Sequence, residues 1–157
     1  MQQSNFTMRQ GRAPDARRLH DLHTASVRAL CRRHYTSEVI DAWLANRRPE
    51  SYLPPIDRGD LFVVEDNSHI VGFGEAVRGM IIAVYVDPGS VRHGVGSAIM
   101  HQALKVARQE HHTAIRLEST LNAIGFYERF RFREVERSSV IRGQVAVPVV
   151  VMERQET

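Results

Sequence analysis

The most informative segment of the chain is Tyr85-Val-Asp-Pro-Gly-Ser-Val-Arg-His-Gly-Val-Gly-Ser-Ala-Ile-Met100. It continues an apolar run at Met80–Val86 that is rich in β-branched residues and is stopped by Asp87 and Pro88, as expected of a buried strand. Beyond the glycines, apolar residues recur with helical spacing over residues 95–107. The sequence therefore predicts a strand, a glycine-containing turn and a helix in direct succession.

Such a turn can hold a phosphate group. The first N–H groups of a helix are unpaired and carry partial positive charge, and Gly94 and Gly96 would let an anion approach the backbone. The segment has neither the Gly-Lys-Ser/Thr of a P-loop nor the third glycine of a dinucleotide-binding turn, so those two site classes are excluded. Two glycines equally suit a tight turn that binds nothing, and the segment alone leaves both interpretations open.

Length and composition indicate one globular domain covering residues 1–157. No apolar run approaches the roughly 20 residues of a membrane-spanning helix, and the N-terminal residues lack the pattern of a secretory signal. Cys31 is the only cysteine, which excludes an internal disulfide and fits a reducing compartment. We therefore expect a cytoplasmic protein with no membrane partner, and we expect Cys31 to be a small buried residue.

The basic residues are spread along the chain. The formal net charge is +3, and of the 21 basic residues only Lys105 is lysine. No segment combines basic and aromatic residues as a single-stranded nucleic-acid platform would, so we expect no nucleic-acid partner. The eight histidines form no set with metal-ligand spacing, so we expect surface histidines and no metal.

Apolar periodicity places the remaining elements. We expect strands at residues 6–9, 61–65, 69–77, 80–86, 114–119, 135–141 and 145–153, and helices that begin at Pro14, begin at Thr36 or Ser37, and cover residues 95–111 and 123–130. The buried face of the first helix is expected at Leu19, Leu22, Ser26 or Val27, and Leu30. The proline-rich residues 47–58 are expected to form a connection with little regular structure. This order predicts an α/β domain with a mixed sheet flanked by helices.

A second strand-to-helix segment follows at Leu117-Glu-Ser-Thr-Leu-Asn-Ala-Ile-Gly-Phe-Tyr-Glu-Arg-Phe-Arg-Phe132. Its strand ends at Ser119, and Asn122 leads into a helix that carries Phe126 and Tyr127. Two parallel strands that each open into a helix in this way can splay apart. A long ligand could then enter between them and pair with the exposed strand-edge groups.

Together the two segments resemble the GNAT superfamily of acetyl-CoA-dependent N-acetyltransferases. The first family motif is matched by Val91-Arg-His-Gly-Val-Gly96, and the second by Asn122, Phe126-Tyr127 and Arg131-Phe132. The resemblance implies the GNAT fold, a mixed and mostly antiparallel sheet with a splayed parallel pair in its centre. Val91 stands where the family usually has Gln or Arg, and Arg92 and Arg131 each stand where it commonly has glycine. The strand at Met80–Val86 also lacks the acidic residue that many relatives use as a base.

The resemblance assigns a role to each matched position. The pyrophosphate of acetyl-CoA would be held by Arg92, His93, Gly94, Val95, Gly96 and Ser97. Backbone groups of Val84 and Val86 would pair with the pantetheine arm, and an N–H near Tyr85 would stabilise the oxyanion. Asn122 would anchor the arm, although its position suits a helix cap equally well.

Tyr127 is the candidate general acid, because a phenol is protonated at neutral pH and can donate to a departing thiolate. Glu75 and Glu118 are the candidate bases, each with an exposed or salt-bridged carboxylate as the alternative. The region of His34, Tyr35 and Trp43 usually lines the acceptor site in this superfamily, but Trp43 also suits a core position.

The resemblance implies an enzyme that transfers acetyl from acetyl-CoA to a primary amine of a small molecule or peptide. Two alternatives stay open at this point: a non-catalytic acyl-CoA-binding regulatory module, and a toxin-like acetyltransferase that acts on charged tRNA. Dimers are common in the superfamily, so a homodimer is compatible with this interpretation.

Overall fold

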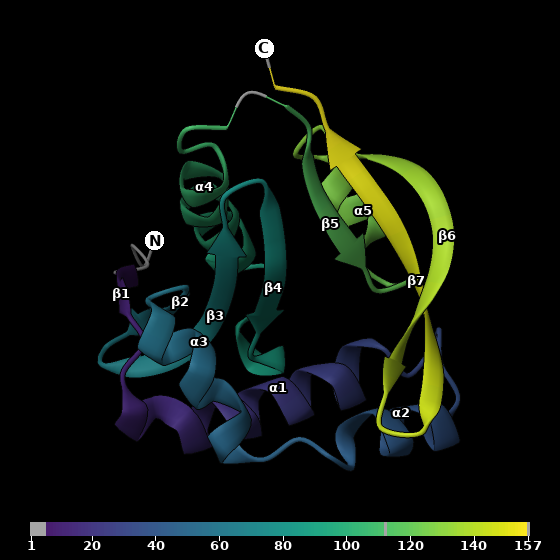
Figure 1. Ribbon diagram of the computed structural model, residues 1–157. Coiled ribbons are helices and arrows are strands. Elements are labelled where there is room, and N and C mark those ends of the chain that lie inside the picture. The colour runs from purple at the N-terminus through teal and green to yellow at the C-terminus, as the bar shows by residue number, and fades with distance from the viewer. Residues whose placement is uncertain (1–5, 112, 157) are drawn as a thin grey trace.

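The computed structural model describes residues 6–111 and 113–156, which form seven strands in one sheet with helices on both faces (Figure 1). The strands are β1 (Phe6–Gln10), β2 (Leu61–Asp66), β3 (His69–Val77), β4 (Met80–Val86), β5 (Ile115–Ser119), β6 (Arg133–Arg142) and β7 (Val145–Arg154). The helices are α1 (Ala16–Leu30), α2 (Ser37–Leu44), α3 (Leu53–Arg58), α4 (Val95–Ala107) and α5 (Ile124–Glu128), and the 3₁₀ turns are η1 (Ala13–Asp15), η2 (Pro49–Tyr52) and η3 (Pro88–Ser90).

The sheet has the order β1-β2-β3-β4-β5-β7-β6, and within it β4 and β5 are the parallel pair. Every other pair of neighbouring strands is antiparallel. This arrangement confirms the predicted mixed, mostly antiparallel sheet with a central parallel pair.

The parallel pair separates soon after it starts. Only Met80 with Arg116 and Ile81 with Leu117 are in register between β4 and β5. A bulge follows, because Ala76 of β3 pairs with Ile81 whereas the preceding Glu75 pairs with Ala83, which leaves Ile82 as an extra residue in β4. Beyond it β4 continues along β3 and β5 continues along β7, so the two strands diverge as Figure 1 shows.

The two faces of the sheet are covered by different helices. α4 and the Tyr127 side of α5 share one hydrophobic cluster with residues of the sheet, among them Ile81, Leu117 and Met152. On the opposite face, Leu19 and Leu22 of α1 belong to a second cluster, which also contains Phe73 of β3. Val27 of α1 belongs to a third cluster, together with residues of α2. The splayed strands therefore lie between two helical layers.

The connection at residues 47–58 is more regular than predicted. It forms η2 and α3, and each of them has a proline in its first turn, Pro49 in η2 and Pro54 in α3. Proline fits there because the first N–H groups of a helical turn need no partner within it, so the prolines start helical structure here instead of preventing it.

Four other sequence-based expectations need correction. α4 ends at Ala107 rather than at residue 111, and α5 covers Ile124–Glu128 rather than residues 123–130. Asn122 does not cap α5, because the N-cap residue is Ala123 and no side chain caps this end. Leu30 is half-buried and lines a cavity instead of completing the buried face of α1. The expected cap Thr36 is confirmed, since its hydroxyl accepts a hydrogen bond from the Val39 N–H.

The packing of α4 against the sheet depends on a missing side chain. A Cβ at Gly74 would lie 2.5 Å from Phe62 Cζ and 2.7 Å from Ile99 Cγ2, well inside van der Waals contact. A larger residue would push α4 away from β3. The helix that follows the candidate phosphate-binding turn is therefore fixed by a close helix-to-strand contact.

We predict that Gly74→Ala lowers the free energy of unfolding by about 1–3 kcal/mol, because it overpacks this contact. Gly125→Ala is the matched control, since a Cβ at Gly125 meets nothing within 4 Å and alanine suits a helix. Urea unfolding of the two variants measures the difference. Equal stability of both variants would contradict the close packing of α4 on β3.

Candidate active site

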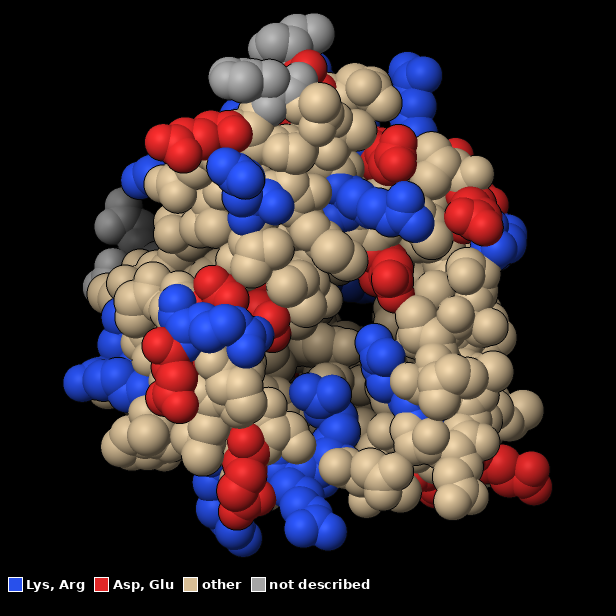
Figure 2. Space-filling view, in the orientation of Figure 1, with Lys and Arg blue, Asp and Glu red and all other residues tan. Residues whose placement is uncertain are grey.

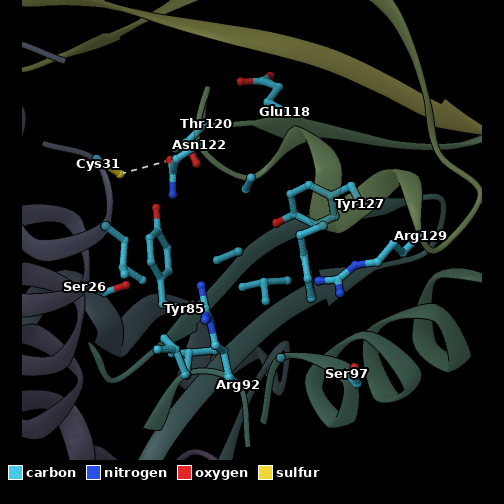
Figure 3. A pocket seen from close by; sticks show the side chains of 18 of the residues that line it. Ser26, Cys31, Tyr85, Arg92, Ser97, Glu118, Thr120, Asn122, Tyr127 and Arg129 are labelled. Atoms are coloured by element: carbon cyan, nitrogen blue, oxygen red, sulfur yellow. Dashed lines mark hydrogen bonds between the residues drawn. The ribbon is translucent and has the colours of Figure 1, made fainter. Parts of the chain in front are cut away.

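A cavity of about 580 Å³ occupies the space where β4 and β5 diverge. Side chains from α1, β4, β5, the turn before α4, and α5 line it, as Figure 3 shows. Of the residues singled out from the sequence, the lining includes Val84, Tyr85, Val86, Arg92, Gly94, Gly96, Ser97, Glu118, Asn122 and Tyr127. The structure thus brings most of the two sequence motifs to one place.

The strand β4 presents unpaired backbone groups to this cavity. The N–H of Asp87 donates to the Val71 carbonyl, so by the alternation of antiparallel ladders Tyr85 is the next residue hydrogen-bonded to β3. The N–H groups of Val84 and Val86 therefore point to the other edge, where β5 has moved away. Their side chains pack into the α4 cluster, whereas that of Tyr85 packs on the α1 side.

The turn before α4 is shaped for an open helix end. Gly94 is the N-cap residue with φ of 86°, and no side chain caps its neighbouring N–H groups. Arg92 also has positive φ, at 64°, and its side chain is exposed at the cavity. The unpaired N–H groups and the dipole of a 13-residue helix thus face the cavity.

Three residues of this turn differ from one another in what they can contribute. Val95 is buried in the hydrophobic cluster, so only its backbone is available to a ligand. His93 is exposed and lies outside the cavity lining. A Cβ at Gly96 would lie 3.1 Å from Phe126 Cε2, so this glycine serves the contact of α4 with α5 as well as access to the backbone.

Tyr127 points its hydroxyl into the cavity from α5 (Figure 3). The ring packs in the cluster with Phe126 and Phe132, and the residue as a whole is buried. Burial raises the pKa of the phenol, and the nearby Tyr85 raises it further. Tyr127 is therefore a neutral hydrogen-bond donor across the physiological pH range.

Asn122 and Cys31 both line the cavity and are hydrogen-bonded to each other, although they are 91 positions apart in the sequence. The Cys31 Sγ donates to Asn122 Oδ1 at 3.3 Å, drawn as the dashed line in Figure 3. Burial raises the pKa of the thiol to about 11, so the sulfur is a neutral thiol near pH 7. Cys31 is buried as the sequence predicted, but it also lines the cavity.

The two candidate bases lie in different surroundings. Glu118 lines the cavity, and Figure 3 shows its exposed carboxylate directed away from Tyr127. Glu75 is outside the lining, on the α1 face of β3. Burial raises the pKa of Glu75, and Arg58, whose Nη2 lies 3.9 Å from its carboxylate, opposes that rise.

The comparisons with known proteins agree with this geometry. A family model described as the acetyltransferase (GNAT) family matches residues 19–132, well over half of the chain. The chain belongs to the GNAT family. This match confirms the family expected from the sequence. It also confirms the expected enzyme class, an acyltransferase.

Individual GNAT proteins match over nearly the whole chain. An Escherichia coli K12 protein named uncharacterized N-acetyltransferase YafP is 24% identical over 137 residues, covering 87% of each chain. A GCN5-related N-acetyltransferase from Rhodopseudomonas palustris gives a TM-score of 0.90 at 20% identity, covering 99% of this chain and 98% of that one. The PaiA N-acetyltransferase of Thermoplasma acidophilum, solved with coenzyme A, gives 0.74 at 17% identity, covering 96% and 99%. YncA of Salmonella typhimurium, solved with its cofactor acetyl-CoA, gives 0.71 at 15% identity, covering 98% and 95%.

Both arginines that depart from the GNAT pattern adopt the conformation that glycine would favour. Arg92 has φ of 64° and Arg131 has φ of 69°. A non-glycine residue in this region costs of order 1 kcal/mol or more, which the surrounding structure must offset. The departure at Arg131 therefore changes the residue but keeps the backbone conformation that glycine would favour.

The GNAT motifs gave no indication of a buried polar group beside the cavity. His23 was expected at the surface, but it is buried, with its Nδ1 2.8 Å from the Tyr52 hydroxyl and its ring stacked on Tyr85 at 3.9 Å. Burial lowers the pKa of His23 well below its usual value, so the imidazole is neutral. Its spacing from Leu19 and Val27, four residues to either side on α1, was the signal that it belongs to the buried face.

Two further properties follow from the described residues, 6–111 and 113–156. They contain no group of three or more His, Cys, Asp or Glu side chains placed to hold a metal ion. None of their helices combines the length and apolar character that a membrane-spanning segment requires.

Trp43 is in the core, where it packs edge-on against Tyr35.

We predict that iodoacetamide modifies Cys31 in the folded protein at least about tenfold more slowly than in the urea-unfolded chain at pH 8, because burial disfavours the reactive thiolate. The folded-state rate should keep rising above about pH 9.5, where an ordinary thiol with a pKa of about 8.5 is almost fully ionised and its rate levels off. Mass spectrometry measures the reaction without ambiguity because the chain has one cysteine. A rate that levels off by about pH 9.5 in the folded protein would show that the thiol is not perturbed.

Proposed function

We propose that this GNAT protein transfers the acetyl group of acetyl-CoA to a primary amine by direct attack. The observation that carries the proposal is the cavity between β4 and β5, with unpaired backbone N–H groups along one wall and the Tyr127 hydroxyl in it. The amides of acetyl-CoA would match the backbone N–H groups of this wall, and its thioester would match the Tyr127 hydroxyl.

The cofactor would enter at the turn before α4. The N–H groups at the start of α4 and the exposed Arg92 and Ser97 would hold the pyrophosphate, and the backbone of Val84 and Val86 would pair with the pantetheine amides. Asn122, whose amide nitrogen is not engaged by Cys31, is available to the same arm. PaiA and YncA, which share this fold, were solved with coenzyme A and acetyl-CoA respectively, which supports the assignment.

Direct attack is favoured over an acylated enzyme. Cys31 is the one thiol in the chain, and it is held neutral with its S–H donating to Asn122. A neutral thiol is a poor nucleophile. The amine nitrogen would therefore bond directly to the thioester carbon, and the C–S bond would break as the tetrahedral intermediate collapses.

Two groups would stabilise the charges that form. A β4 N–H beside Tyr85, from Val84 or Val86, would donate to the developing oxyanion, an interaction typically worth about 2.7–4 kcal/mol in such sites. Tyr127 would donate its proton to the departing sulfur. Its raised pKa keeps the proton in place until the thiolate forms.

The attacking amine must lose its proton. We assign this step to Glu118 rather than Glu75, because Glu118 lines the cavity and Glu75 is engaged by Arg58 outside it. Since the Glu118 carboxylate is directed away from Tyr127, the proton would travel through water. The lack of an acid on β4 is what favours the alternative, a non-catalytic acyl-CoA-binding module.

A thiol-release assay with acetyl-CoA and a panel of amines distinguishes the two functions. An enzyme releases CoA in proportion to an acceptor amine. A binding module gives no release with any amine, although CoA raises its melting temperature.

We predict that Tyr127→Phe lowers kcat by about tenfold or more while the Kd for acetyl-CoA stays unchanged, because only the proton donor is removed. Tyr35→Phe is the control: it removes a hydroxyl that bonds the Pro148 carbonyl and the Leu121 N–H outside the cavity lining. It should lower the melting temperature with little change in kcat. Equal kcat for Tyr127→Phe and wild type would remove Tyr127 from the mechanism.

We also predict that Glu118→Gln lowers kcat/KM by about tenfold or more at neutral pH. The loss should shrink as the pH approaches the pKa of the amine, since a neutral amine needs no base. Glu75→Gln serves as the comparison and should retain most of the rate across a profile from about pH 6 to 10. A larger loss for Glu75→Gln than for Glu118→Gln would reverse the assignment.

A further inference from the structure

The cavity ends on the side of the sheet covered by α1, where a polar network surrounds Tyr85. The Tyr85 ring stacks on His23, which contacts the Tyr52 hydroxyl. The Arg47 side chain lies 5.1 Å above the Tyr52 ring, and its Nε donates to the same hydroxyl at 3.3 Å. Through these contacts Arg47 is held beside the Tyr85 end of the cavity.

The β6–β7 hairpin brings a second arginine to this place. The hairpin tip rests on the end of α2, as Figure 1 shows, and a Cβ at Gly143 would lie 2.9 Å from the Ala42 carbonyl oxygen and 3.0 Å from Asn46 Nδ2. Arg142 directly precedes Gly143, and Arg47 directly follows Asn46. The two arginines therefore stand on either side of this contact between the hairpin tip and α2. Burial raises the pKa of Tyr85 to about 12, and the positive charges of Arg47 and Arg142 oppose that rise.

Neither cation has an acidic partner among the described residues. Arg9, Arg18, Arg28, Arg58 and Arg137 each lie within 4.0 Å of a carboxylate, but Arg142 contacts only the Ile141 carbonyl and Arg47 only Tyr52. The charge of Arg47 lowers the pKa of Glu75, but that carboxylate is already approached by Arg58. Both lie outside the cavity lining, beyond its Tyr85 wall, and together they leave a local excess of positive charge there. Figure 2 shows Lys and Arg side chains gathered below the hollow in the centre of this face.

A negative charge lies in the cavity itself. Glu118 lies on β5, on the face opposite to the buried Leu117, and its exposed carboxylate lines the cavity. An acceptor with an ammonium group and an anionic group would match this separation. The ammonium would lie near Glu118, and the anionic group near the arginines.

We propose that the acceptor is a small amine that also carries an anionic group, a carboxylate, phosphate or phosphonate, bound by Arg47 and Arg142. The proposal rests on the proposed acetyl transfer and specifies its substrate class. Arginine suits this task because its planar guanidinium donates two parallel hydrogen bonds to such oxyanions. A small acceptor fits better than charged tRNA, because Figure 2 shows basic groups gathered below one hollow while acidic and basic groups alternate over the rest of this face.

Matched amine pairs test this substrate class. L-phenylalanine is compared with L-phenylalaninamide, and 2-aminoethylphosphonate with ethanolamine, so that each pair differs in the anionic group. We expect kcat/KM to favour the anionic member of at least one pair by about tenfold or more, as charge-assisted hydrogen bonds would give. The carboxylate and phosphonate pairs also identify which anion the site prefers.

Arginine variants connect the preference to the two side chains. Arg142→Gln, at an exposed position, should reduce the preference by about tenfold, and Arg47→Gln should act in the same direction. Arg137→Gln is the control, because that arginine is exposed on the same hairpin but paired with Glu134 at 2.7 Å. The Kd for acetyl-CoA should stay unchanged in all three.

Calorimetric titration of the same amines into the enzyme–CoA complex separates this inference from the proposed function. If no amine is acetylated but the anionic amines bind and Arg142→Gln weakens their binding, the acetyl transfer fails and the anion site stands. Equal handling of both members of each pair would overturn the proposal, as would an unchanged preference in Arg142→Gln. Acetylation of aminoacyl-tRNA with neither turnover nor binding of the small amines would overturn it as well.

Discussion

The hydrogen bonds that β4 and β5 do not make determine the rest of the site. Two residue pairs are in register, and then the strands part, although each remains paired to its other neighbour. Backbone N–H and carbonyl groups in a protein interior must find partners, so this edge requires a ligand or water along its length. A sheet that is continuous elsewhere thus keeps one internal edge open for a peptide-like molecule. The start of α4 lies at one end of this opening, and the polar network around Tyr85 lies at the other.

The parts of the site that are local in sequence could be predicted from it. A strand that runs into Gly94 and then an amphipathic helix defines an open helix end whatever surrounds it. The same holds for the strand and helix around Tyr127, because both follow from short-range periodicity and turn residues. The central position of the parallel pair followed only after the two segments were considered together with their family resemblance.

Contacts between distant segments could not be predicted in this way. Asn122 was expected as an anchor or a cap, and nothing near it in sequence indicates that its partner is Cys31. Arg142 was one of many spread arginines until the hairpin tip was found on the end of α2. Glu75 and Glu118 were equivalent as strand carboxylates, and only the tertiary packing distinguishes a half-buried acid near Arg58 from one that lines the cavity.

The extra residue at Ile82 has a consequence for side-chain direction. Side chains alternate between the faces of a strand, so one inserted residue exchanges the faces of everything after it. Ile81 faces α4, and in an unbroken strand Ala83 and Tyr85 would face it too, with Val84 and Val86 toward α1. The insertion reverses this assignment and turns the aromatic ring of Tyr85 toward α1. The uniformly apolar run conceals this inversion, so a strand of the same sequence that paired Ile82 regularly with β3 would turn the Tyr85 ring toward α4.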